Sequence, residues 1–101
     1  MVIDASALIA ILCDEPDASR FEAALALDRC AVHKASIEVV AFDLEQAEVA
    51  RDAHRRYGRG RHPAALNYGD CFSYALCATR GEALLFKGDD FGKTDLKSAL
   101  G

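Results

Sequence analysis

Three acidic side chains stand where they could share a metal ion. Asp4 follows the short apolar run Val2 to Ile3, Asp70 falls in the first turn of an expected helix, and Asp89 closely follows the apolar run Ala83 to Phe86. In open α/β sheets the ligand crevice lies outside the carboxyl ends of the strands, so these carboxylates can converge there. Converging carboxylates repel one another unless a divalent cation such as Mg²⁺ or Mn²⁺ neutralises them. Such an ion can support water attack on a phosphodiester.

Each acid also has a purely structural interpretation. Asp4 could be only the N-cap of the helix that follows it. Asp70 could simply complement the dipole of its helix, and Asp89 and Asp90 could be ordinary turn residues. The metal-site interpretation rests on finding all three acids where the fold would bring them together.

Basic residues are concentrated in one stretch of an otherwise acidic chain. The formal net charge is −4, which alone would argue against a nucleic-acid binder that depends on general electrostatic attraction. Yet five arginines fall within eleven positions, followed by His62; they are Arg51, Arg55, Arg56, Arg59 and Arg61. The stretch predicts a basic patch. Its alternative is a solvated helix face, because Arg51 and Arg55 are spaced i,i+4 beside Glu48 and Asp52.

Length and composition predict one domain spanning residues 1–101. A chain of 101 residues with 51% hydrophobic residues has material for a single hydrophobic core. We see no charged leader and no apolar run long enough to span a bilayer, so we expect a cytoplasmic protein that does not enter a membrane. The cysteines lack CxxC spacing and are expected to be buried free thiols; they are Cys13, Cys30, Cys71 and Cys77.

Helical and strand-like segments alternate along the chain, which predicts an α/β sandwich. Expected helices cover Ala5–Leu12, Asp17–Leu27, a segment from Asp43 to Tyr57, a segment from about Asn67 to Arg80, and a last short helix capped by Thr94. Expected strands cover Val2–Ile3, Cys30–His33, Ile37–Phe42 and Ala83–Phe86. Asp43 with Gln46 resembles a capping box, and Gly58 and Gly81 are typical helix stops.

One junction does not fit this alternation. Only three residues, 34–36, separate the strand candidates Cys30–His33 and Ile37–Phe42. Two parallel strands need a crossover of about a dozen residues or more. Either these runs are not both parallel strands, or a segment is missing.

Three blocks of sequence resemble the PIN-domain VapC-type toxins: VIDASALIAIL, GRGRHPAALNYGDCFSYALC and LLFKGDDFGKTD. They occur in the family's order, and the resemblance extends over nearly the whole chain. The resemblance implies a three-layer α/β/α sandwich with a mostly parallel sheet. It further implies a magnesium-dependent endoribonuclease that cleaves RNA, is restrained by a VapB-type antitoxin and forms a homodimer.

Carried over residue by residue, the resemblance assigns the metal and catalytic roles to Asp4, Asp70 and Asp89, with Asp90 as the adjacent competitor for the third position. Ser6 corresponds to a small hydroxyl residue beside the metal site. The basic stretch then becomes a surface that meets RNA phosphates. Its assigned members are Arg55, Arg56, Arg59 and Arg61.

The chain departs from the family pattern between Ser36 and Ile37. There the family has a helical pair whose first helix carries a further acidic ligand. Two helices and their connection would occupy about 25 to 30 residues. The loss of a segment of this length would also explain why only three residues separate the two strand candidates. An alternative is therefore a catalytically impaired PIN remnant that only binds antitoxin or a partner subunit. A third hypothesis, a phosphoacceptor receiver domain, rests on the suitable length and on Asp4, Asp43 and Lys87, each of which follows a strand candidate.

Overall fold

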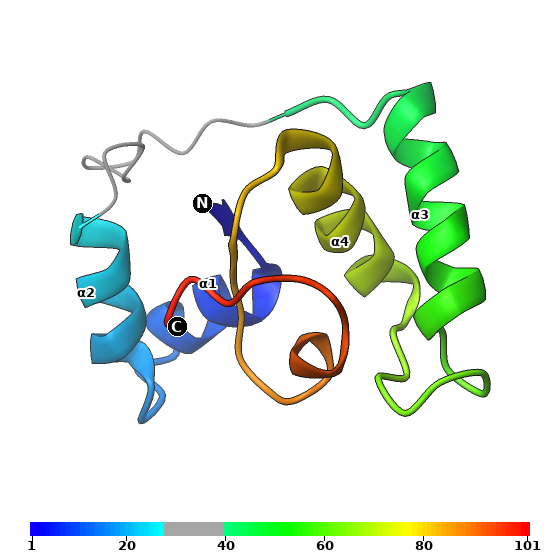
Figure 1. Ribbon diagram of the computed structural model, residues 1–101. Coiled ribbons are helices and arrows are strands. Elements are labelled where there is room, and N and C mark those ends of the chain that lie inside the picture. The colour runs from blue at the N-terminus through cyan, green and yellow to red at the C-terminus, as the bar shows by residue number, and fades with distance from the viewer. Residues whose placement is uncertain (28–39) are drawn as a thin grey trace.

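The computed structural model describes residues 1–27 and 40–101 (Figure 1). Within them the elements are β1 (Val2–Ile3), α1 (Ala5–Leu12), α2 (Ala18–Leu27), α3 (Leu44–Tyr57), α4 (Tyr68–Arg80), β2 (Leu84–Leu85) and the 3₁₀ helix η1 (Phe91–Lys93). None of the helices in these two ranges is long and apolar enough to cross a membrane.

The sheet joins the two ends of the chain. β1 and β2 are parallel, with Val2 opposite Leu84 and Ile3 opposite Leu85. On the other side of β2, Leu84 exchanges backbone hydrogen bonds with the C-terminal segment: its N–H donates to the carbonyl of Lys97 over 2.9 Å, and its carbonyl accepts from Ala99 N–H over 2.8 Å. β2 therefore lies between β1 and the C-terminal segment.

The alternation of side chains along β2 separates two hydrophobic clusters. Leu84 belongs to a cluster with buried residues of α3 and α4, whereas Leu85 belongs to one with buried residues of α1 and α2. Both leucines are fully buried. Successive side chains of a strand point to opposite faces, and Figure 1 shows the two helix pairs on opposite sides of the strands. The arrangement is a three-layer α/β/α sandwich, as the sequence predicts.

Local signals determine where the helices begin and end. Asp43 caps α3 by accepting a hydrogen bond from Gln46 N–H over 2.9 Å. Asn67 and Asp70 form a reciprocal capping box at the start of α4, and Gly81 ends that helix in the left-handed conformation with φ of 66°. These are the stop and start signals that the sequence contains. The predicted bounds of the four helices are therefore confirmed to within one or two residues.

Several sequence predictions are corrected. Val40 to Phe42, expected to continue a strand, form none, and Phe42 is half exposed. Thr94 does not cap a further helix: it ends η1, and its hydroxyl donates to the carbonyl of Phe91 over 2.7 Å. Cys13 is exposed, whereas Cys71 and Cys77 are buried free thiols as expected.

Some predictions fall on residues 28–39, outside the described ranges. They concern the strand candidate Cys30–His33, the beginning of the candidate Ile37–Phe42, the thiol of Cys30 and the junction between Ser36 and Ile37.

Gly58, directly after α3, is required by close packing and not by an unusual backbone angle, since its φ is −66°. A Cβ at this position would lie 2.3 Å from the carbonyl oxygen of His54. We expect Gly58→Ala to lower the free energy of unfolding by about 1 to 3 kcal/mol, the usual cost of overpacking. Chemical denaturation measures it. The matched control is Gly92→Ala, because a Cβ there meets nothing within 4 Å; equal losses in both variants would contradict this explanation.

Candidate functional site

Asp4 is a buried carboxylate at the junction between β1 and α1, with 7% of its surface exposed. One carboxylate oxygen, Oδ2, accepts hydrogen bonds from the Ser6 N–H (2.9 Å) and from the Ser6 hydroxyl (2.6 Å). The other, Oδ1, accepts from the hydroxyl of Ser73 over 2.5 Å. Asp4 is thus the N-cap of α1, as the structural interpretation holds, and it also connects α1 to α4. A buried charge is tolerated when it is hydrogen-bonded in this way.

Ser6 extends this arrangement to the segment after β2. Its hydroxyl accepts a hydrogen bond from the backbone N–H of Lys87 over 3.0 Å, while it donates to Asp4. The end of β2 is therefore attached to the beginning of α1. The resemblance places Ser6 beside the acidic site, and the structure shows it in contact with Asp4.

Asp70 lies in the first turn of α4, where its carboxylate accepts the backbone N–H of Asn67 over 2.9 Å. Burial raises the pKa of Asp70, and the negative charges of Asp4 and Asp90 raise it further; the hydrogen bond from Asn67 and the positive charge of Arg59 oppose the rise. Three carboxylates and one arginine therefore act on the same small region. Their mutual repulsion is the condition that a bound cation relieves.

Asp89 and Asp90 occupy the exposed turn before η1. Of these two acids, Asp90 is the one whose charge acts on Asp70, where it contributes to the raised pKa. The sequence pattern alone gives no reason to prefer it.

The acidic group fits a divalent cation in donor type and in charge. Carboxylate oxygens are the ligands of Mg²⁺ and Mn²⁺, and Mg²⁺ usually keeps several water ligands beside one or two protein carboxylates. Across residues 1–27 and 40–101, no three acidic, histidine or cysteine side chains stand close enough to hold an ion by themselves. An ion bound by the carboxylates in these two ranges would therefore take some of its ligands from water.

Ser73 is a site residue that the sequence prediction missed. It lies three positions after Asp70 on α4, and residues three apart share one face of a helix. This spacing is the only signal that pointed to it, because a serine inside a helix is otherwise unremarkable.

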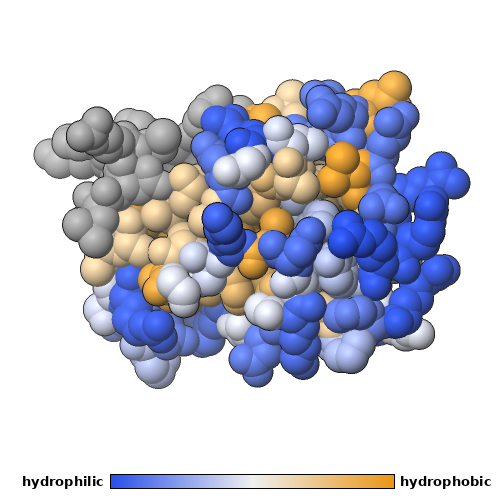
Figure 2. Space-filling view, in the orientation of Figure 1, coloured by the Kyte–Doolittle hydropathy of each residue, from blue (hydrophilic) through white to orange (hydrophobic). Residues whose placement is uncertain are grey.

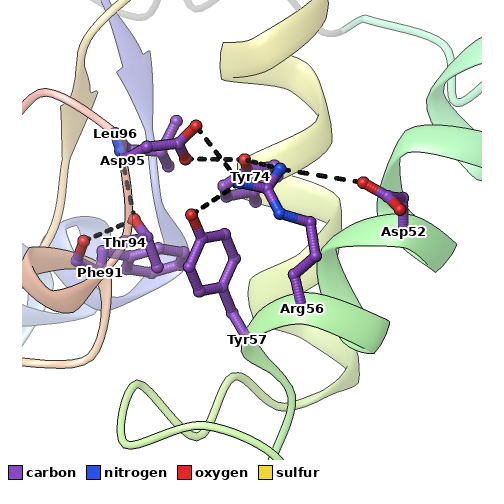
Figure 3. Close-up of polar contacts among 8 residues, drawn as sticks. All are labelled: Asp52, Arg56, Tyr57, Tyr74, Phe91, Thr94, Asp95 and Leu96. Atoms are coloured by element: carbon purple, nitrogen blue, oxygen red, sulfur yellow. Dashed lines mark hydrogen bonds and ion pairs between the residues drawn. The ribbon is translucent and has the colours of Figure 1, made fainter.

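The four arginines expected to meet RNA are all exposed but differ in their surroundings. Arg55 and Arg56 lie in the last turn of α3, and Arg59 and Arg61 lie in the loop that follows. Arg59 is close enough to Asp70 to lower the pKa of that carboxyl. Arg56 instead contacts protein groups (Figure 3). Figure 2 shows hydrophilic side chains gathered over α3, at the right of the view.

The buried cysteines are not candidates for chemistry. Burial raises the pKa of the Cys77 thiol to about 12, with a smaller contribution from Glu82. Burial also raises the pKa of Cys71. Both side chains are therefore protonated thiols at neutral pH, and the thiolate is the form that attacks or binds metal.

The chain is similar to known proteins over most of its length. The sequence profile of the family described as PIN domain matches residues 31–97. Ribonuclease VapC30 of Mycobacterium tuberculosis is 45% identical over an alignment of 125 positions that includes 95% of each chain. Ribonuclease VapC of Mycolicibacterium smegmatis is 46% identical, over 95% of this chain and 97% of its own. Ribonuclease VapC42 of Mycobacterium tuberculosis is 39% identical over 98% of each chain.

These alignments are longer than the chain itself. The alignment to Ribonuclease VapC30 spans 125 positions, whereas 95% of 101 residues is about 96 residues. About 29 aligned positions therefore have no residue in this chain. This number agrees with the 25 to 30 residues that the sequence predicts to be missing near Ser36.

Removing the hydroxyl of Ser73 tests its bond to Asp4. We expect Ser73→Ala to lower the free energy of unfolding by about 1.5 to 3 kcal/mol, the range for a hydrogen bond to a charged group. Ser19→Ala, on the exposed surface of α2, is the control and should change it by less than about 0.5 kcal/mol. If the two variants are equally stable in urea, the bond contributes nothing to the fold.

Asp70 is expected to lower stability at neutral pH. Its raised pKa means that the folded chain binds a proton more tightly than the unfolded chain, so stability falls as the pH rises from the unfolded pKa through the folded one. Asp70→Asn should therefore raise the melting temperature at pH 7, and the gain should vanish below the unfolded pKa. The control is the exposed Asp14→Asn. A gain that persists unchanged at low pH would show that charge is not its cause.

Proposed function

Because the chain belongs to the PIN-domain family, we propose that it is a metal-dependent endoribonuclease, the toxin of a type II toxin–antitoxin system. The observation that carries the proposal is the buried Asp4 carboxylate, held by Ser6 and Ser73 beside the charges of Asp70 and Asp90. The similar proteins are named VapC ribonucleases, which supports the same reaction. The substrate is RNA, and the products arise by hydrolysis of a phosphodiester.

In this proposal Asp4, Asp70 and Asp90 would hold Mg²⁺ together with water ligands, with Mn²⁺ as an alternative ion. When bound, the ion supplies an activated water and stabilises the charge of the in-line displacement. The protein residues orient this group: Ser6 and Ser73 fix both oxygens of Asp4. Asp89, which the sequence prediction placed third, remains the competitor that variants must separate from Asp90.

Arginines beside the acidic group would position the RNA strand. Arg59 is near Asp70, and Arg55 and Arg61 are exposed on the same helix end and loop. Contacts between arginine and phosphate fix the register of a strand without reading its sequence. The proposed interface therefore leaves target choice to other contacts.

A VapB-type antitoxin and a second copy of the chain are the proposed protein partners, in the cytoplasm and without a membrane. Exposed aromatic side chains between α3 and α4 support a protein contact. The ring of Phe72 lies 4.5 Å from that of Phe42 and 4.6 Å from that of Tyr68, and all three are exposed. Apolar groups gathered on a surface in this way are typical of binding sites.

A second candidate function follows from the shortened sequence. About 29 positions of the relatives are absent, and residues 1–27 and 40–101 provide no three-donor metal cluster. On this alternative the chain is an impaired PIN remnant that binds antitoxin or a partner subunit without cleaving RNA.

Ribonuclease assays with Mg²⁺ or Mn²⁺ test the proposal. Asp4→Asn, Asp70→Asn and Asp90→Asn should each lower kcat by about 100-fold or more, because an ion at such a site stabilises the transition state by several kcal/mol. Asp89→Asn, beside the group, is the matched control and should retain activity. Loss in Asp89→Asn with retention in Asp90→Asn would restore the original assignment.

Two further results decide between the candidates. Equal activity in the unchanged chain and in every variant would show that a contaminating nuclease is responsible. An inactive chain that still captures a VapB-type antitoxin would establish the second candidate instead.

A further inference from the structure

Arg56 makes several contacts with protein groups (Figure 3). One guanidinium nitrogen, Nη2, donates to the hydroxyl of Tyr57 over 2.9 Å and lies 3.8 Å from a carboxylate oxygen of Asp95. The other, Nη1, donates to the hydroxyl of Tyr74 over 3.4 Å and lies 3.8 Å from Asp52. The side chain is about half exposed, at 47%. Its donors nevertheless face two tyrosines and two carboxylates.

Tyr74 connects this group to α4. Its side chain is buried, and its hydroxyl donates to Oδ1 of Asp95 over 2.7 Å. Burial raises the pKa of Tyr74 far above its ordinary value, with a further rise from its hydrogen bond to Asp95. The hydroxyl therefore remains protonated, and able to donate, at neutral pH. Arg56, Tyr74 and Asp95 join α3, α4 and the segment after η1.

The segment that ends at Asp95 begins at the acidic turn. Lys93 N–H donates to the carbonyl of Asp90 over 3.2 Å. The hydroxyl of Thr94 donates to the carbonyl of Phe91 over 2.7 Å and accepts from Leu96 N–H over 3.2 Å. Short hydrogen-bonded turns thus follow one another from Asp90 to Leu96.

Phe91 anchors the beginning of this segment in the core. It is 3% exposed and its ring lies 5.3 Å from that of Phe86. The packing of Phe91 in the core holds one end of the segment, and the hydrogen bond between Asp95 and Tyr74 of α4 holds the other. Only four residues, 91–94, separate Asp90 from Asp95, and hydrogen bonds link them along this length.

We propose that Arg56 is a positioning residue: with Tyr74 and Asp95 it holds the turn of Asp90 against α4, whose first turn carries Asp70. The sequence prediction gave Arg56 a contact with RNA instead. Asp52 and Asp95 stand 3.8 Å from its guanidinium nitrogens, and these two carboxylates would repel a phosphate that approached the same group. The catalytic consequence rests on the proposed function, whereas the positioning itself does not.

Hydrogen exchange tests the positioning without any RNA. Arg56→Ala and Tyr74→Phe should speed exchange of the Lys93, Thr94 and Leu96 amides by about tenfold, the effect of losing one hydrogen bond to a charged group. Arg61→Ala, from the same basic stretch, is the matched control and should leave these amides unchanged. Tyr74→Phe removes only the hydroxyl, so it gives an answer if Arg56→Ala does not fold. Unchanged exchange in both variants would overturn the proposal.

Kinetics separate a positioning residue from an RNA contact. Arg56→Ala and Tyr74→Phe should lower kcat about tenfold and leave KM for RNA unchanged, whereas Arg61→Ala should raise KM. Arg56→Lys, which keeps the charge but loses the forked geometry, should be intermediate in kcat. A raised KM with normal kcat in Arg56→Ala would restore the RNA contact. Faster exchange in a chain that cleaves no RNA would support the positioning role and overturn the proposed function alone.

Discussion

The carboxylate of Asp4 is a charge in a buried place, and its position depends on the groups that solvate it. Those groups belong to two elements: Ser6 comes from α1, and Ser73 from the middle of α4. The backbone N–H of Asp4 meanwhile donates to the carbonyl of Leu85 at the end of β2, over 2.9 Å. Because an unpaired buried charge is very costly, these segments have few alternative arrangements. Asp4 thus fixes the start of α1, the connection between α1 and α4 and, through its backbone N–H, the end of β2.

The same region carries an unfavourable charge balance. Asp70 is hydrogen-bonded within its own capping box, yet burial and the charges of Asp4 and Asp90 make its ionised form costly. The favourable contributions lie elsewhere, in the leucines of β2 that enter two separate clusters. Local destabilisation supported by a well-packed frame is common at functional sites. The hydrophobic packing of the sandwich therefore offsets the unfavourable free energy of the acidic group.

Sequence patterns predicted what local rules decide. Asp43, Asn67 and Gly81 are recognisable start and stop signals, and the helices follow them closely. Tertiary contacts were beyond such rules. Tyr74 and Asp95 are 21 residues apart and bond only in the folded chain, so nothing near Arg56 in the sequence reveals its surroundings. The exposure of Cys13 and the absence of a strand at residues 40–42 likewise depend on packing that no local pattern specifies.

The parallel pairing of β1 with β2 has a consequence for biosynthesis. The strand that precedes Asp4 is synthesised well before its partner, residues 84–85, which follow more than 80 positions later. A nascent chain that has reached Arg80 contains Asp4, Asp70 and all of α4, but it lacks β2 and the turn of Asp90. Contacts between distant segments form late and slowly. On the ribosome, the acidic group therefore cannot be assembled until residues 84–90 have been synthesised.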